Sequence, residues 1–552
     1  MKNIIKYIRI IGFAFVFSVM TSCGSDWLDI NKDPNNPTEA SSDLLLTNAE
    51  LNIVNSMGLS TGGLSSHLGV FMHQVTRRGD PDQYGTSGSN FMIGTAWDGL
   101  FTNAFEDLRV MIAQSEESGD MIYAGMGKIL KAYAYSIMID VWGDLPFDEA
   151  NQLPEIRFPT YENGQDVYPK IFALIDEGIG DMTNSEAQNT NTPGADDLFY
   201  GGSIDLWTKF ANTLKLKLYN QVRLSPNAGD YNIIDNVRSL LQDELISDMS
   251  EDFELWYGVT QTPDNRHPAF IADYAGGQKT YYISIWFYQT LTGQNVNVLN
   301  GISDPRMPYY FFNQLAGGDA QNPEEFREGD FLSIHFGSTH PNQAQAQDQS
   351  QTMLGLYPCG GRFDDGQGGV VSQTSAAGDV SERLLTYYSR LFIEAELSLA
   401  GIATGDARQL LEEAIRASFS KVNQAVLNTA GSATAPQSIP TIGQTDEDDY
   451  VAAVLAEYDA ANNDDRRLEV ILTQKWIASF GNSVDQYNDY RRTGFPVIFD
   501  PNNDTGPFAP FTQSSRDFLV SLPYKELDLT INPNAPAQRN PVSDRVFWDP
   551  NN

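Results

Sequence analysis

Amphipathic helical segments that come in pairs constrain the fold of this chain more than any other feature. In residues 203–224 an apolar side chain recurs every four positions, at Leu206, Phe210, Leu214 and Leu218. This spacing places the four side chains in one stripe along a helix, and the stripe has to be buried against a neighbouring element. A chain dominated by such segments is predicted to adopt a mainly α fold.

Four pairs of such segments can be drawn along the chain. Residues 385–400 and 407–418 form one pair with the length of a tetratricopeptide unit, and we expect Asp406 in the intervening turn to cap the second helix. The other pairs are 124–143 with 167–182, 203–224 with 233–245, and 449–463 with 465–480. The sequence therefore predicts a scaffold of four tetratricopeptide-like helical hairpins at uneven spacing.

Residues 250–380 have a different composition, rich in Gly, Asn, Gln and Pro with aromatic residues between them. Residues 77–91 share this character. Turn-forming residues at this density predict a loop-rich region with little β structure. Because long loops in a compact protein usually carry function, we place the ligand site in these two segments.

Aromatic residues in the two loop segments are the candidates for ligand binding. Planar rings stack on sugar or peptide faces, and nearby amides and carboxylates hydrogen-bond to the ligand. The predicted ligand-binding residues are Asp82, Tyr84, Phe91, Tyr281, Tyr282, Trp286, Phe336 and Tyr357. The alternative for each ring is a place in the core, and Trp286 in particular lies at helical spacing with Ile283 and Phe287.

The first 22 residues have the features of a secretory signal. Three basic residues precede an uncharged apolar run from Ile10 to Met20, and no acidic residue is present. Residues 20–23, Met-Thr-Ser-Cys, resemble a bacterial lipobox, in which Cys23 becomes the lipid-modified first residue. The alternative is a soluble exported protein in which Cys23 is incidental.

This N-terminus predicts the organisation of the whole chain. We expect a lipoprotein signal peptide at 1–22, a lipidated tether at 23–45 with turn formers from Asp33 to Pro37, and a single ligand-binding domain at 46–552. No later segment is apolar for long enough to suggest a transmembrane helix. The acyl chains on Cys23 would hold the protein on its membrane without help from basic residues.

The charge of the chain excludes several classes of partner. There are 72 acidic and 35 basic residues, for a formal net charge of -37. Such a chain repels phosphate backbones and anionic lipid headgroups, so we expect no binding to nucleic acid. The two cysteines cannot form a disulfide framework, and lipidation of Cys23 would leave Cys359 without a partner in the chain.

Motifs that would indicate catalysis are not evident. We expect neither phosphoryl transfer, zinc proteolysis nor serine hydrolysis, and therefore no enzyme activity and no catalytic residue. The five histidines are scattered, so no metal site is expected. The turn at Asp364 to Gly366 could offer oxygens to calcium, but this sequence is far more often a plain turn. We expect no cofactor.

Six segments spread over nearly the whole mature chain carry a family resemblance. They read DWLDINKDPNNPTEAS after the lipobox, SIMIDVWGDLPFDEA, DLWTKFANTLKLKLYNQVRL, SDPRMPYY, LLTYYSRLFIEAELSLAG and QKWIASFGNSVDQYNDYRRTGFP. In combination they resemble the SusD/RagB family of outer-membrane lipoproteins, and its SusD-like branch most closely.

The resemblance implies a fold and a role. The implied fold is α-rich, with four tetratricopeptide-like hairpins as scaffold and a loop-rich remainder that carries the ligand site. The implied role is that of a non-catalytic lipoprotein on the cell surface. It would capture a glycan or oligopeptide and deliver it to a SusC-like TonB-dependent transporter in the outer membrane. The ligand contacts of the family are not tied to these motifs, so no binding residue is transferred.

The resemblance also bears on the arginine pair at residues 491 and 492. We expect both side chains to pair with carboxylates and to lock the last long helix to the following turn, a structural role.

Two other functions remain as alternatives. Abundant acids and aromatics would suit a secreted glycoside hydrolase on an α-rich scaffold. The hairpins alone would suit a tetratricopeptide scaffold for protein partners, although such a scaffold needs a concave helical face rather than aromatic loops. The negative charge disfavours a strongly anionic ligand.

Overall fold

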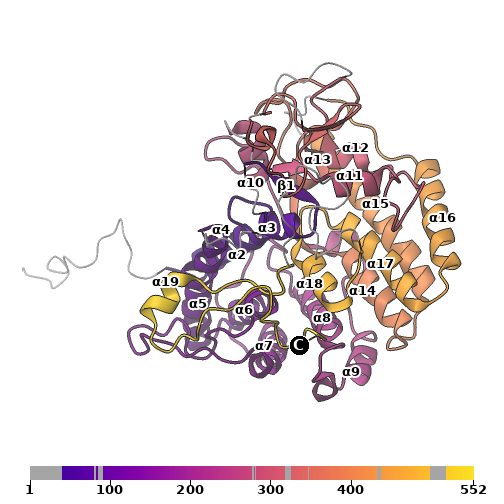
Figure 1. The fold of residues 1–552 in the computed structure, drawn as a ribbon. Helices are drawn as coiled ribbons and strands as arrows, with labels where there is room; N and C mark the ends of the chain where they lie inside the picture. The colour runs from indigo at the N-terminus through magenta and orange to yellow at the C-terminus, as the bar shows by residue number, and fades with distance from the viewer. Residues whose placement is uncertain are drawn as a thin grey trace, which may run out of the picture.

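The computed structural model describes residues 40–79, 83–84, 91–276, 279, 281–316, 325–345, 347–431, 437–497 and 518–551 (Figure 1). Helices dominate this part of the chain, and its strands form four two-stranded sheets. The predicted mainly α fold with little β structure is confirmed. The predicted signal peptide and Cys23 lie outside the described residues.

The N-terminal part of the scaffold is built around the buried helix α6. The helices here are α2 (Ser42–Met57), α5 (Phe105–Ser118), α6 (Met121–Trp142) and α7 (Gly164–Met182). An added Cβ at Gly125 of α6 would lie 2.5 Å from the carbonyl oxygen of Gly178 in α7, so the glycine allows these helices to approach closely. The α6–α7 pair is the first of the predicted hairpins. Helix α2 begins inside the segment predicted as tether.

Three further helix pairs complete the scaffold. They are α8 (Ile204–Val222) with α9 (Ile233–Leu240), α14 (Tyr387–Leu399) with α15 (Ala407–Gly431), and α16 (Gln444–Ala460) with α17 (Asp464–Ala478). All four predicted hairpins are thus confirmed, although α9 ends at Leu240 rather than Leu245. The predicted cap is also present, because Asp406 Oδ1 accepts hydrogen bonds from the backbone N–H groups of Arg408 (2.9 Å) and Gln409 (3.2 Å).

The loop-rich region contains short elements only. Its helices are α10 (Pro268–Phe270), η5 (Ile271–Ala275), α11 (Ile285–Leu291), α12 (Met307–Tyr310), η6 (Pro341–Ala344) and α13 (Leu356–Cys359). Its strands are β2 (Phe253–Trp256), β3 (Tyr281–Ile283), β4 (Phe311–Phe312), β5 (Phe326–Glu328), β6 (Phe331–Ser333), β7 (Met353–Leu354) and β8 (Ser381–Leu385). The antiparallel pairs are β2–β8, β4–β7, β5–β6, and β3 with β1 (Val75–Arg77).

The remaining elements lie between or after these groups along the chain. They are α3 (Leu64–Phe71), α4 (Phe91–Asp98), η2 (Gly99–Ala104), η3 (Ala228–Tyr231), η4 (Met249–Glu251), α18 (Val484–Thr493) and α19 (Glu526–Ile531). One hydrophobic core runs through all of these parts, from Leu45 to Trp548. None of the described helices is long and apolar enough to span a membrane.

Cys359, at the end of α13, belongs to this core. Its side chain is fully buried, and its thiol donates to the carbonyl oxygen of Gly355 at 3.4 Å. Burial raises the pKa of this thiol well above its usual value. The thiol is therefore an inert packing group rather than a nucleophile.

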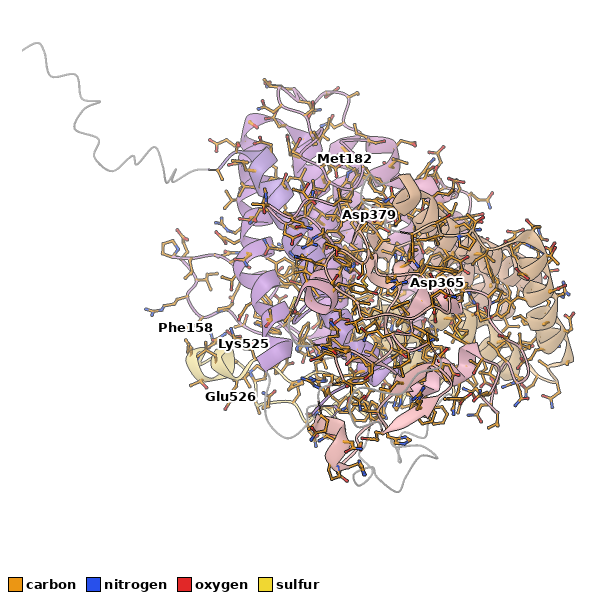
Figure 2. The ribbon with its side chains drawn as sticks, turned by 90° about the horizontal axis from the view of Figure 1, so that it is seen from above. Phe158, Met182, Asp365, Asp379, Lys525 and Glu526 are labelled. Atoms are coloured by element: carbon orange, nitrogen blue, oxygen red, sulfur yellow. The ribbon has the colours of Figure 1, made fainter. Side chains whose placement is uncertain are left out.

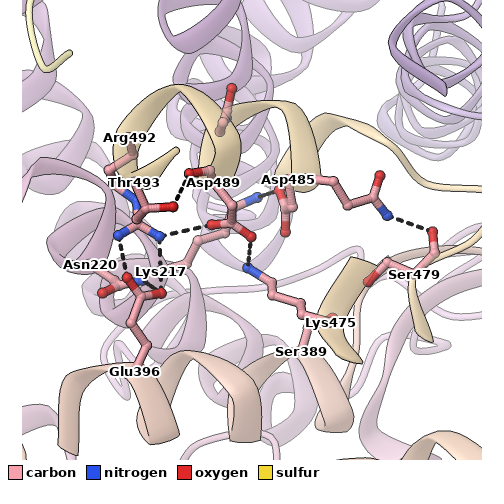
Figure 3. A network of polar contacts seen from close by, with 12 residues as sticks. Lys217, Asn220, Ser389, Glu396, Lys475, Ser479, Asp485, Asp489, Arg492 and Thr493 are labelled. Atoms are coloured by element: carbon pink, nitrogen blue, oxygen red, sulfur yellow. Dashed lines mark hydrogen bonds and ion pairs between the residues drawn. The ribbon is translucent and has the colours of Figure 1, made fainter. Parts of the chain in front are cut away.

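A buried ionic network joins α8, α14, α17 and α18 (Figure 3). The two oxygens of Glu396 accept from the guanidinium of Arg492, and Arg223 also pairs with this carboxylate. Arg492 contacts Asp489 at 2.9 Å, and Asp489 contacts Lys475 at 2.8 Å. Burial alone would raise the pKa of Glu396, but the two arginines more than offset that effect and hold it well below its usual range.

The network tests the prediction made for the arginine pair. Arg492 pairs with carboxylates as predicted. Arg491 differs, because its guanidinium donates to the carbonyl oxygens of Val520 (2.8 Å) and Asp140 (2.5 Å) and to the amide oxygen of Asn488 (2.6 Å). It thereby ties α18 to α6 and to the C-terminal segment, so its role is structural, but the predicted carboxylate partners and the predicted link to the following turn are wrong for Arg491.

Candidate functional site

Three of the predicted ligand-binding residues come together around His73. The imidazole of His73 stacks on Phe336 with ring centroids 4.1 Å apart, and the rings of Phe336 and Tyr84 are 5.4 Å apart. The Trp286 ring meets His73 edge to face at 6.4 Å. Burial lowers the pKa of His73 to about 3, so the imidazole is neutral at ordinary pH. Three of the residues predicted to bind ligand thus form one aromatic cluster with His73.

Most of the predicted rings point into the protein. Tyr84, Tyr282, Phe336 and Tyr357 are at most 5% exposed, whereas Tyr281 and Trp286 are half-buried. The hydroxyl of Tyr357 donates to the carbonyl oxygen of Ala478 at 3.0 Å. Loops without long helices need large side chains to fill their interior, which explains this burial. Among the six rings just described, only the two half-buried ones could reach a ligand in this conformation, and their role stays a prediction.

Two predicted residues are described only in part or not at all. Asp82 lies outside the described residues, and for Phe91 only the backbone at the start of α4 is described. In the turn considered for calcium, Asp364 Oδ1 accepts from the N–H of Gly366 at 3.1 Å. In the described part of the chain no three His, Cys, Asp or Glu side chains gather to hold a metal ion.

The structure adds a polar pocket that the sequence did not predict. It has a volume of about 560 Å³ and lies between α2, the loop after α2, the α4–η2 helix and the start of η5. Its polar lining consists of Asn52, Asn55, Ser56, Ser60, Thr61, Thr95, Asp98 and Asn103, and its remaining lining of Gly62, Ala96, Gly99, Pro268 and Ile271. We call it the amide pocket.

Two π-helical segments border the amide pocket. The π-helix η2 supplies Gly99 and Asn103, and the π-helix η5 begins at the lining residue Ile271. Such segments are rare and occur frequently at functional sites. An added Cβ at Gly99 would lie 2.5 Å from Ser56 Oγ, so this glycine lets η2 approach α2 closely. The backbone at the pocket therefore departs from regular α-helix in two places and is closely packed at Gly99.

The lining groups suit a neutral polar ligand. Asn103 Nδ2 donates to Asn52 Oδ1 at 3.3 Å, and Ser60 Oγ donates to the carbonyl oxygen of Asn55 at 2.7 Å. Amide and hydroxyl groups offer both donors and acceptors, which matches a ligand with many hydroxyl groups. The one carboxylate in the lining, Asp98, is paired with Lys525. The pocket therefore offers hydrogen bonds without a strong net charge.

A second, smaller pocket lies on the other side of the α4–η2 helix. Its volume is about 250 Å³, and its lining is largely apolar, with Trp97, Phe101, Pro146, Pro159, Leu527 and Ile531. Asp98 and Lys525 border it as well. In Figure 2 Lys525 and Phe158 lie close together at this edge of the molecule, beside α19. The Asp98–Lys525 pair thus sits where α19 meets the wall between the two pockets.

A buried histidine and glutamate connect two walls of the amide pocket. Glu382 Oε2 accepts from the N–H of Leu59 at 3.1 Å, beside the wall residue Ser60, and lies 3.2 Å from His267 Nε2. His267 precedes the wall residue Pro268, and its Nδ1 accepts from the N–H of Ala269 at 3.2 Å. The His267–Glu382 link thereby fixes the loop after α2 relative to α10 and η5.

The expectation that the chain carries no GxSxG motif of serine hydrolases is wrong. Residues 58–62 read Gly-Leu-Ser-Thr-Gly, which has the GxSxG spacing of hydrolase nucleophiles. They connect two helices rather than a strand and a helix, and Ser60 Oγ donates to a backbone carbonyl. Both ring nitrogens of His267 face other partners, Ala269 and Glu382. Among the described contacts Ser60 Oγ thus donates to a backbone carbonyl and not to the base that this chemistry requires.

The amide pocket escaped prediction because its residues come from three distant segments. From the sequence alone, Asn52 and Asn55 would be assigned to the solvent-exposed face of a helix. One feature could have pointed to them, since residues 51–76 contain no Asp, Glu, Lys or Arg although 19% of the chain is charged.

Comparison with known proteins gives a consistent result. A SusD-like family model, described as starch-binding and associating with the outer membrane, matches residues 34–509. The chain is similar to a SusD homologue from Bacteroides fragilis, with 19% identity, TM-score 0.67 and coverage of 93% of this chain and 99% of the other. A search of curated proteins found no match.

Two further solved structures have the same fold. One is a chitin-binding SusD homologue from Flavobacterium johnsoniae, with 18% identity, TM-score 0.64 and coverage of 91% of this chain and 98% of the other. The other is a SusD/RagB family protein from Bacteroides thetaiotaomicron, with 18% identity, TM-score 0.66 and coverage of 93% and 99%.

Proposed function

The chain belongs to the SusD-like family, and on that basis we propose that it is a lipoprotein on the outer surface of the outer membrane that captures a carbohydrate and delivers it, without catalysis, to a SusC-like TonB-dependent transporter. The family match over residues 34–509, together with the amide pocket, carries this proposal.

The chemistry of the pocket supports a carbohydrate ligand. Sugar hydroxyls donate and accept hydrogen bonds, as do the amides and hydroxyls of Asn52, Asn55, Ser60 and Asn103. The volume of about 560 Å³ lies in the range of small-ligand pockets. The family description names starch and a similar structure is described as chitin-binding, so we favour a neutral glycan over an oligopeptide.

Calorimetry with a ligand panel tests the carbohydrate proposal. The panel contains chitin, starch, xylan and β-glucan oligosaccharides and a mixture of oligopeptides. We expect one glycan class to bind, and Asn55→Ala to weaken that binding roughly three- to tenfold through a lost hydrogen bond. Asn462→Ala, which removes an exposed amide between α16 and α17, is the matched control. Binding of oligopeptides alone would refute the carbohydrate assignment.

The cellular part of the proposal rests on the lipobox and the family. We expect metabolic labelling with a palmitate analogue to mark the wild-type chain and not Cys23→Ser. We also expect a large β-barrel protein to co-purify from outer membranes in mild detergent. An unlabelled protein that purifies alone would contradict the proposed anchor and partner.

The non-catalytic part has its own test. Incubation of the bound oligosaccharide with the protein should leave its length unchanged, as judged by chromatography. Release of shorter products that is lost in a carboxylate variant would favour the glycoside hydrolase instead.

A further inference from the structure

The smaller pocket, which we call the α19 pocket, presents large apolar side chains to solvent. Leu527 and Ile531 of α19 line it and are 56% and 59% exposed. Trp97 and Phe101 of the α4–η2 helix, together with Pro159, supply much of the remaining apolar lining. An open pocket with aromatic groups in its lining and exposed aliphatic groups on one side is suited to receive an apolar side chain.

Hydrogen bonds hold α19 against the opposite side of the α19 pocket. Asn532 Nδ2, directly after α19, donates to the carbonyl oxygen of Pro159 at 2.8 Å. The hydroxyl of Tyr161 donates to Asp528 Oδ2 within α19. The pocket is therefore formed before any group enters it, and little conformational freedom of its walls is lost on binding.

The charged groups at the α19 pocket have both signs. Lys525 pairs with Asp98, and Asp528 is a second carboxylate in the lining. These charges offset each other in part, so we expect apolar contact to supply most of the attraction for a bound group. Carboxylate oxygens can also accept a hydrogen bond from an indole N–H. The lining thus suits a tryptophan side chain.

The N-terminal segment that precedes α2 supplies such a side chain. All tryptophans of the chain except Trp27 belong to the described residues. Trp27 is followed by Leu28 and Ile30, and residues 24–39 otherwise consist of Gly, Pro and polar residues. An indole gains free energy when it leaves water for an apolar pocket, so this segment contains a group that benefits from docking.

The segment is long enough to reach the α19 pocket. The carbonyl oxygen of Ala40 accepts from Gln114 Nε2 at 3.4 Å, so the chain enters α2 beside the last part of α5. The pocket residue Phe101 lies near the other end of the continuous η2–α5 helix, about 20 Å from Gln114. Residues 28–40 span up to about 43 Å when extended. The reach of Trp27 therefore exceeds the distance that it has to cover.

We propose that the side chain of Trp27 docks in the α19 pocket of its own chain. Its indole would lie against Trp97 and Phe101, with its N–H toward the carboxylates of the lining. Because the segment is covalently attached, its local concentration is high, and a contact of modest strength is sufficient for occupancy. The other occupants that such a pocket could take are a second copy of this chain and the proposed transporter.

Docking would orient the whole protein on its membrane. This consequence rests on the proposed lipid anchor at Cys23, since residues 24–26 alone would then separate the anchor from Trp27. Three residues span no more than about 10 Å. The face that carries α19 would therefore be held close to the membrane surface, instead of swinging on the full length of the segment before α2.

The experiment is crosslinking within the soluble mature chain carrying Cys23→Ser, in which the buried Cys359 does not react. Asp29→Cys places a thiol near Trp27, and Thr102→Cys places another at an exposed residue of the α19 pocket. A short bismaleimide joins the two thiols. We expect crosslinking about tenfold faster than in the same chain with Trp27→Ser, which keeps the length of the segment but removes the indole.

A distant thiol provides the matched control. Leu427→Cys replaces Thr102→Cys, at a residue of α15 that is 65% exposed. In Figure 1 α15 lies on the side of the molecule away from α19. This pair should crosslink slowly whether or not Trp27 is present. Thermal unfolding of each variant confirms that it is folded.

Each other outcome overturns the inference. Equal rates with Trp27 and with Trp27→Ser would show that chain length alone brings the thiols together. A rate no higher than that of the Leu427→Cys pair would leave the pocket to another partner, such as the transporter. Crosslinked dimers would assign it to a second copy of the chain. The experiment contains no glycan, so its failure would leave the carbohydrate-binding proposal intact, and calorimetry tests that proposal separately.

Discussion

Two buried carboxylates, one in the helical scaffold and one in the loop-rich region, have pKa values shifted in opposite directions. Glu396 in α14 is paired with two arginines and its pKa is held low. Asp273 in η5 is equally buried, but burial raises its pKa to about 7 and Lys279 offsets this only in part. Its Oδ2 has no hydrogen-bond partner among the described residues. Glu396 thus has both oxygens paired with arginines, whereas Asp273, two residues after the pocket residue Ile271, keeps one oxygen without a partner among the described residues.

The largest effect is expected from breaking the scaffold network. Glu396→Ala leaves Arg223 and Arg492 buried beside an empty position, and this should lower the free energy of unfolding by about 3–5 kcal/mol. Urea denaturation measures the loss. Glu394→Ala on the same helix removes a carboxylate that pairs with Arg390 nearer the surface, and should cost about 1 kcal/mol. Equal losses of unfolding free energy in the two variants would show that the buried Glu396 network is no more important for stability than the Glu394–Arg390 pair.

An intermediate effect is expected at the His267–Glu382 link. Glu382→Ala removes the acceptor of the Leu59 N–H and the partner of His267, which should lower the free energy of unfolding by about 1–3 kcal/mol. It should also weaken glycan binding, because the pocket walls lose their connection. Glu382→Gln keeps an acceptor oxygen and should retain most of the affinity. If Glu382→Ala lost stability but bound glycan as wild type, the link would not position the pocket.

The pH dependence of the free energy of unfolding tests the difference between the two carboxylates. The pKa of Asp273 is about 7 in the folded protein against an ordinary value of 3.8, so its stabilising contribution is fully present below about pH 4 and is lost as pH rises through about 7. Wild type should therefore lose stability relative to Asp273→Asn over this range. A difference that stays constant with pH would show that Asp273 ionises normally.

The smallest effect on stability is expected in the pocket itself. Asn103→Ala removes a partly exposed amide from η2 and should change the free energy of unfolding by no more than about 0.5 kcal/mol. Its effect should appear in ligand affinity, as a loss of roughly threefold or more. A large loss of stability would show that η2 depends on Asn103 for its conformation.

Local patterns were sufficient to predict the scaffold. The four-residue spacing of Leu206, Phe210 and Leu214 defines a buried stripe wherever the helix is placed, and Asp406 caps α15 through groups within three residues of it. Such features depend on near neighbours in sequence, so they could be recognised without the fold.

The candidate site could not be predicted from sequence patterns, because it is formed by contacts between residues that lie far apart in the chain. The rings of Tyr84 and Phe336 were predicted to contact ligand, but both are buried by partners far away in the chain, and that role stays a prediction. The π-helical conformation of η2, which brings Gly99 against Ser56, leaves no distinct periodicity in the sequence. The pocket could therefore be found only once α2, η2 and η5 were placed together.

The complete burial of Cys359 has a practical consequence. A soluble form that starts after Cys23 would contain this one cysteine, and its thiol is out of reach of labelling reagents. A cysteine introduced at the exposed Val259 would then be the sole reactive thiol. A fluorophore attached there would mark one known position on the surface loop that leads to His267 and Pro268, in an otherwise unaltered protein.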